Sequence, residues 1–244
     1  IVLGANQYRG IENPVHFSRE DRRRHLYLIG QTGTGKTTMF LNMIVQDIQN
    51  GEGVAVVDPH GDLIEDILLH IPPERVNDVV LFDPRDRDMP LGFNILEARD
   101  EAQKDLIANE VVNILQKLAA RLNPESVGPM FEHYLRNALL ALAQDPSATL
   151  IDVPRMFVDS SFRSAVLKHV TNPTVRQFWD QEFTQSQRGQ LSADMLSYVI
   201  SKLGRFISND TVRNIIGQAQ SSFDVREIMD QKKILLCNLS KGQL

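Results

Sequence analysis

Residues 30–37 read Gly-Gln-Thr-Gly-Thr-Gly-Lys-Thr, a complete match to the phosphate-binding loop pattern G-x-x-x-x-G-K-[ST]. The apolar segment before it, 26–29, predicts a β-strand, and residues 36–50 have the apolar spacing of a helix that Gly51 would end. A glycine-rich loop between a strand and a helix points backbone N–H groups and the positive end of the helix dipole at an anion. The motif therefore predicts a nucleotide-binding site.

Each part of this loop has a role in the chemistry of a nucleotide, so we expect ATP and Mg²⁺ as cofactors. Lys36 is expected to contact the β- and γ-phosphates and to act catalytically by neutralising their charge, and the Thr37 hydroxyl is expected to ligate Mg²⁺. The residues predicted to bind the nucleotide are Gly30, Thr32, Gly33, Thr34, Gly35, Lys36, Thr37 and Thr38.

A second candidate catalytic residue is Asp58, which follows the apolar run 53–57. An acid at the carboxyl end of a parallel strand lies at the edge where such folds bind ligands, where it would hold a metal-bound water. The alternative is that residues 58–63 form a turn in which Asp62 caps the next helix. The residues alone leave both interpretations open.

The pattern of strands and helices along the chain changes twice. Up to residue 96, predicted strands at 26–29, 54–57 and 79–82 alternate with helices at 36–50 and 62–70, which is typical of a parallel α/β sheet with helices on both faces. Strand patterns then disappear until the apolar run 233–239. The helices predicted between them are 107–122 behind an Asp100 N-cap, 131–142 after Pro129, 162–170, 173–183 and 191–207.

We therefore predict an α/β fold in which a P-loop core is interrupted by an all-α domain. The predicted domains are the nucleotide-binding core at 1–96, the inserted helices at 97–230 and a return strand of the core at 231–244.

Composition excludes some classes of protein. The 244 residues contain 26 Lys+Arg against 31 Asp+Glu, a net charge of -5, so the molecule is no polycation that coats nucleic acid and any DNA contact must be local. A single cysteine, Cys237, in an apolar run and the lack of ~18 consecutive apolar residues predict a cytoplasmic location. Because the first residue is not Met, we expect a fragment, whose full-length form would be compatible with an anchor at the inner face of the membrane.

Taken together, these motifs resemble the HerA/FtsK superfamily of ring ATPases, and within it the type IV secretion coupling proteins. The resemblance rests on residues 30–37 and on Asp-Pro-His-Gly-Asp at 58–62, Phe-Asp-Pro at 82–84, Gly-Phe-Asn-Ile at 92–95, Phe-Asp-Val-Arg at 223–226 and Asn-Leu-Ser-Lys-Gly at 238–242. It implies a RecA-like core and an ATP-driven motor, assembled as a homo-hexameric ring, that moves DNA or a nucleoprotein during conjugation or secretion. A partner in the membrane or secretion channel is also implied.

The chain departs from that family at one point. In the family, an apolar strand that ends in Asp-Glu supplies the acid for hydrolysis, and no such pair follows an apolar strand here. We interpret this as truncation and expect the chain to bind ATP–Mg²⁺ but to hydrolyse it slowly. Asp83 follows a predicted strand, but Pro84 stands where the second acid belongs.

Basic residues offer further candidates. Arg22, Arg23 and Arg24 are either a solvated edge or contacts to a nucleotide or a neighbouring subunit, and Arg205, Arg213 and Arg226 are candidate arginine fingers. Three other functions stay open: a HerA-like translocase for DNA processing, a secretion ATPase that moves protein, and a cargo-docking adaptor for which ATP is an assembly switch.

Overall fold

The computed structural model describes residues 1–122, 128–186, 203–204 and 207–240. The chain divides into two compact units, which we call the α/β unit (Ile1–Asp86 with Phe223–Leu244) and the helical unit (Arg87–Ser222). Compact units do not mark where an insertion enters a fold, so the domain limits expected at residues 96 and 230 stay a prediction.

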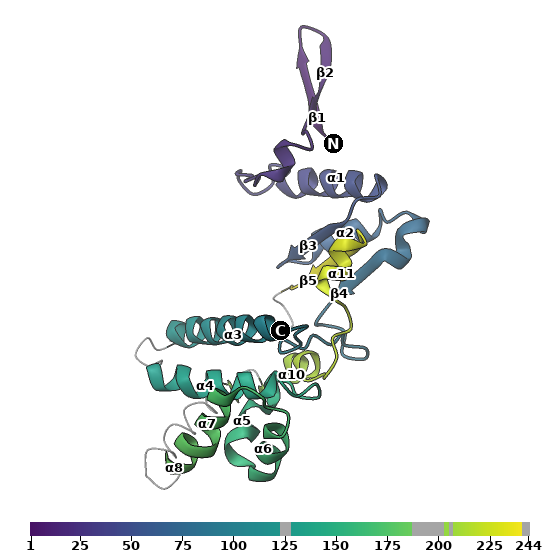
Figure 1. Cartoon of the computed structure of the whole chain (residues 1–244). Helices are drawn as coiled ribbons and strands as arrows, with labels where there is room; N and C mark the ends of the chain where they lie inside the picture. The colour runs from purple at the N-terminus through teal and green to yellow at the C-terminus, as the bar shows by residue number, and fades with distance from the viewer. Residues whose placement is uncertain (123–127, 187–202, 205–206, 241–244) are drawn as a thin grey trace. The chain divides into compact units, whose positions relative to one another are not determined.

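The α/β unit contains a hairpin, a parallel sheet and several helices (Figure 1). Its elements are β1 (Val2–Tyr8), β2 (Ile11–His16), η1 (Asp21–Arg23), α1 (Lys36–Gln49), β3 (Val54–Asp58), α2 (Asp62–Leu68), η2 (Pro73–Asp78), β4 (Val79–Phe82), α11 (Val225–Asp230) and β5 (Ile234–Asn238).

The sheet has the strand order β3-β5-β4, and both pairings are parallel. Ile234 lies opposite Val54 on one side and Val79 on the other, so the strand predicted near the end of the chain lies between the two earlier strands. The core of the unit packs helices α1 and α2 against β3 and β5 through Ile48, Val56, Ile64, Ile67, Ile234 and Leu236.

Two expectations about this sheet are wrong for the described residues. Residues 26–29 form no strand, and the side chains of Tyr27 and Ile29 are 85% and 79% exposed. Strand propensity measures how well a residue fits a paired, half-buried surface, and no described strand pairs with this segment. Helices also fail to cover both faces of β3, since Val57 is 64% exposed.

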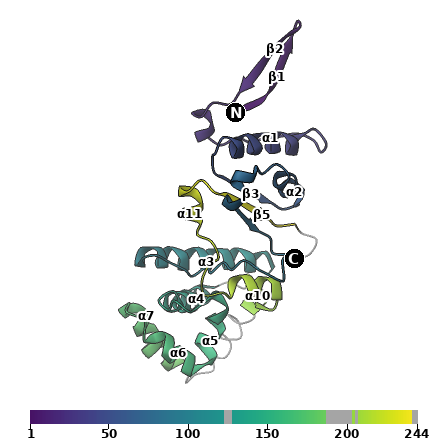
Figure 2. The same ribbon diagram turned by 90° about the vertical axis from the view of Figure 1, so that its right-hand side faces the viewer.

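The hairpin β1–β2 was not predicted. It turns at Arg9 and Gly10, both with positive φ, as hairpin turns with the strand twist require. Tyr8 and Ile11 beside this turn are each 63% exposed. In both views the hairpin projects beyond α1 without another described element beside it (Figure 1, Figure 2).

The helical unit is all-α over its described residues, as predicted. Asp100 caps the N-terminus of the first helix by accepting from Gln103 N, and the expected 173–183 helix changes from α to π geometry at Phe178. The elements are α3 (Glu101–Leu122), α4 (Pro129–Leu142), η4 (Leu150–Asp152), α5 (Val153–Val158), α6 (Ser160–Leu167), α7 (Pro173–Gln177), the π-helix η5 (Phe178–Phe183), α8 (Thr184–Ser186) and α10 (Asp210–Ile216).

Most of the helix predicted at 191–207 lies outside the described residues. The core of the helical unit is rich in aromatic side chains, and Trp179 lies within it and donates to Asn137 O. Within the part of the chain that the structure describes, no helix combines the length and the apolarity needed to cross a membrane.

Candidate nucleotide-binding site

The loop that precedes α1 depends on its glycines. Gly33 and Gly35 have φ values of +81° and +86°, in the left-handed region that side chains other than glycine rarely adopt. At Gly30 the reason is space, because a Cβ atom there would lie 2.7 Å from the Thr34 hydroxyl oxygen. That hydroxyl donates to Gln31 O at 2.8 Å, which closes the loop into a compact turn.

Lys36 folds back over this turn. Its ammonium nitrogen lies 2.7 Å from Gly30 O and 2.6 Å from Gln31 O, and it donates to both carbonyl groups. An ammonium group has three donors, so one donor is left after these two bonds. Lys36 is therefore placed over the loop by the loop itself, with capacity for an additional acceptor.

The start of α1 is open to an anion. The first N–H groups of a helix have no partner within the helix, and the first turn of α1 holds neither an acidic side chain nor a side-chain cap. The predicted ligands Thr37 and Thr38 lie in this turn and are exposed, as is Thr32 in the loop. The eight residues predicted to bind the nucleotide thus lie in one short loop and one helical turn.

Asp58 is held by its own turn. The residue is 7% exposed, and its carboxylate accepts hydrogen bonds from three backbone N–H groups, those of His60 at 2.9 Å, Gly61 at 2.9 Å and Leu63 at 3.0 Å. Bonds of this kind shape the turn that leads into α2 and occupy the oxygens that a base would need. The geometry favours a turn at residues 58–63, but the expected capping by Asp62 is wrong, because the N-cap of α2 is Gly61 and Asp62 is the first residue of the helix. The catalytic role of Asp58 stays a prediction.

Asp83, which follows β4, is also held by hydrogen bonds within the chain. Arg85 donates to both carboxylate oxygens, with Nη2 to Oδ2 at 2.6 Å, and these side-chain bonds lower the pKa of Asp83 below its usual value. Burial opposes this shift but is outweighed. An acid that is bound by its own chain in this way is a poor candidate for positioning water.

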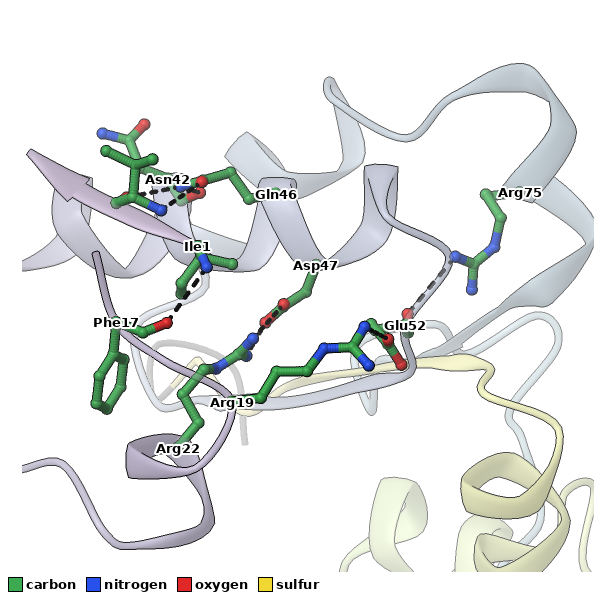
Figure 3. A network of polar contacts seen from close by, with 10 residues as sticks. Ile1, Phe17, Arg19, Arg22, Asn42, Gln46, Asp47, Glu52 and Arg75 are labelled. Atoms are coloured by element: carbon green, nitrogen blue, oxygen red, sulfur yellow. Dashed lines mark hydrogen bonds and ion pairs between the residues drawn. The ribbon is translucent and has the colours of Figure 1, made fainter. Parts of the chain in front are cut away.

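The arginines before the loop differ in environment. Arg22 donates Nη1 to Asp47 Oδ1 at 2.8 Å and Nη2 to Oδ2, forming a two-pronged ion pair with the buried Asp47 on α1 (Figure 3). This hydrogen bonding raises the pKa of the Arg22 guanidinium. Arg22 is thus a structural residue, whereas Arg23 and Arg24 are exposed.

The candidate arginine fingers receive no support from geometry. Arg213 pairs with Asp210 at 2.7 Å on the surface of α10, and Arg205 lies outside the described residues. Arg226 lies in the first turn of α11, where its backbone N–H donates to the N-cap Asp224 Oδ1 at 2.8 Å. The finger role stays a prediction for all three.

The sequence reasoning missed one polar group in this unit. Asn238, at the end of β5, is 1% exposed, and its amide nitrogen has no hydrogen-bond partner. The signal available in the sequence was an amide residue directly after four apolar residues of a predicted strand.

Comparison with known proteins places this geometry in context. Residues 13–121 match the family model described as the type IV secretion-system coupling protein DNA-binding domain. A search of curated proteins found no match to the chain. Among solved structures, the chain is similar to the bacterial conjugative coupling protein TrwBdeltaN70 in its unbound monoclinic form, with a TM-score of 0.53 and 16% sequence identity.

The alignment covers 95% of this chain but 49% of the solved protein, so the chain corresponds to about half the length of that relative. At this identity the similarity concerns the fold, and it agrees with the predicted α/β class with a helical part. The resemblance to the coupling proteins of type IV secretion, drawn from the motifs of the sequence, is thus confirmed by a family model over residues 13–121 and by a solved structure for the fold.

Proposed function

We propose that this chain binds ATP with Mg²⁺ through residues 30–37 and is the nucleotide-binding part of a motor that moves DNA or a nucleoprotein in conjugation or type IV secretion. The observation that carries the proposal is the loop before α1. It combines left-handed glycines, a lysine folded over the turn and a helix start without an acid. These are the elements that bind a polyphosphate.

The oxygen chemistry of the site suits magnesium. Mg²⁺ prefers oxygen ligands, and in phosphate-binding loops it takes the Ser/Thr hydroxyl together with phosphate oxygens. Thr37 is the residue that would supply the hydroxyl. When bound, the cation neutralises charge that develops on the phosphates.

The partner in this proposal is DNA, in agreement with the description of the matching family model. The net charge of -5 requires that the contact be local, and a homo-hexameric ring would repeat a few side chains around a pore. Because Asp58 and Asp83 are both held by bonds within the chain, we expect this chain to release phosphate slowly.

The first prediction tests the loop. Lys36→Ala should weaken binding of a fluorescent ATP analogue about 100-fold, because it removes charge-assisted hydrogen bonds to phosphate. The thermal unfolding midpoint without nucleotide should stay unchanged, since Lys36 bonds only to exposed loop carbonyls. Titration of fluorescence measures the first quantity, and circular dichroism measures the second.

Lys117→Ala is the matched control, because Lys117 is an exposed lysine in the helical unit. It should leave binding unchanged. Affinity within twofold of the wild-type value in Lys36→Ala would contradict the proposed nucleotide site.

A further inference from the structure

Asn238 carries a buried donor that the fold leaves unpaired. Its Oδ1 accepts from Ser240 N at 3.3 Å, but its Nδ2 has no partner and is, among the described residues, the one buried side-chain polar atom in this condition. Buried polar groups are nearly always paired in folded proteins, since an unpaired one loses its bonds to water without replacement. The exception calls for an explanation.

A second buried amide shows what ordinary pairing looks like. Asn94 in the helical unit is 5% exposed, and its Nδ2 donates to Ala148 O at 3.1 Å and to Ala219 O at 2.8 Å. Its Oδ1 accepts from Leu96 N at 3.0 Å. Asn94 thus uses its amide to hold three segments together, whereas Asn238 keeps its donor free.

The location of Asn238 suggests a ligand. Asn238 and Asp58 are paired residues at the carboxyl ends of the parallel strands β5 and β3, and this edge binds ligands in open α/β sheets. Helix α1 ends at Gln49 and β3 begins at Val54, so the chain reverses and the strands point toward the end where α1 starts. Figure 1 shows the arrowheads of β3 and β5 on that side.

Gly61 packs closely against the side-chain amide of Asn238. Its φ is +96°, and a Cβ atom there would lie 2.9 Å from Asn238 Oδ1 and 3.3 Å from Nδ2. Any larger residue would press on the amide and shift it. The bond from Gly61 N to Asp58 Oδ2 holds the turn in place beside Asn238.

We propose that Asn238 is a ligand-binding residue of the nucleotide site, whose Nδ2 donates a hydrogen bond to an oxygen that arrives with the nucleotide. The acceptor is an oxygen of the terminal phosphate or a water molecule that the nucleotide holds. This inference rests on the proposed function. It explains the unpaired donor as a group that gains its partner only in the bound state.

The test uses Asn238→Leu, which keeps the approximate shape of the side chain and removes the donor. We expect about tenfold weaker binding of a fluorescent ATP analogue to the chain, the loss typical of one hydrogen bond to a charged group. Unchanged ADP binding would identify the terminal phosphate as acceptor, and equal weakening of both nucleotides would identify a held water. Asn238→Ala, which adds no apolar bulk, should give the same pattern.

Stability separates this role from a structural one. Without nucleotide, Asn238→Leu should change the thermal midpoint little, because removal of the unpaired buried donor offsets the loss of the 3.3 Å bond from Ser240 N to Asn238 Oδ1. The matched control Asn94→Leu should lower the midpoint, because it breaks paired bonds, and should leave the affinity for ATP unchanged.

Three results would overturn the inference. The first is an unchanged affinity for ATP in both Asn238 variants. The second is a drop in the nucleotide-free thermal midpoint of Asn238→Leu that is as large as the drop in Asn94→Leu. The third is a loss of ATP affinity in Asn94→Leu that equals the loss in Asn238→Leu. A wild-type chain that binds no nucleotide would instead refute the proposed function, and with it this inference.

Discussion

The two ends of helix α1 differ in how their polar groups are used. At the carboxyl-terminal end, Gln46 bonds both the N and the O of Val2, and Asp47 binds Arg22 (Figure 3). Arg75 donates to Ile48 O at 2.9 Å at the same end. At the amino-terminal end, Lys36 bonds only carbonyl groups of its own loop, and the first turn has no acid.

The difference separates groups that stabilise the fold from groups that are available for a ligand. Gln46, Asp47 and Arg22 find their partners within the chain and fasten the base of the hairpin and the segment before the loop onto α1. The opposite end keeps N–H groups and a cation that no acidic side chain of its first turn neutralises. Changes at the first end should therefore alter stability, and changes at the second should alter nucleotide binding.

The largest effect on stability is expected at the carboxyl-terminal end of α1. Asp47→Ala should lower the free energy of unfolding by about 2–3 kcal/mol, because it leaves the partly buried Arg22 without its partner. Urea denaturation with an unchanged m-value measures this loss. The control Arg23→Ala removes an exposed neighbour and should cost less than about 0.5 kcal/mol. Equal losses in the two variants would contradict the structural role of the Arg22–Asp47 pair.

A smaller change in stability, combined with a loss of ATP binding, is expected at the amino-terminal end of α1. Gly35→Ala should cost about 1–2 kcal/mol, because alanine is strained at a φ of +86°. It should also weaken ATP binding by distorting the entry into α1. Gly128→Ala is the control, since Gly128 has a φ of -101° and open space around it. If Gly35→Ala binds ATP as well as Gly128→Ala does, the loop is not the anion site.

The smallest effect concerns Asp83, which is bound by its own chain as Asp47 is, but nearer to the surface. The side-chain bonds from Arg85 lower the pKa of Asp83, so its contribution to stability is present above the ordinary pKa of about 4 and is lost as the pH falls through the lowered value. Asp83→Asn should therefore flatten the loss of stability below about pH 4 and cost about 1 kcal/mol or less at pH 7. Denaturation midpoints between pH 2 and 7 measure both quantities, and an unchanged acid profile would show that the pair does not stabilise the fold.

Local patterns in the sequence predicted the elements whose causes are local. The strands at 54–57 and 79–82, the helix end at Gly51 and the N-cap at Asp100 follow from neighbouring residues, and the structure contains all of them. The sequence also predicted the candidate phosphate-binding loop, because its glycines and lysine lie within eight consecutive positions.

Contacts between distant residues decided the rest. The position of β5 between β3 and β4 brings residue 234 beside residues 54 and 79, and the absence of a strand at 26–29 reflects the lack of a described partner strand rather than any property of its residues. The sequence by itself determined the loop, the described helices α1 to α4 and the apolar strands β3, β4 and β5, since propensity and spacing act over a few residues. Only the tertiary structure decided that Arg22 pairs with Asp47 and that Asn238 keeps a free donor, because a polar group's partners depend on which segments pack against it.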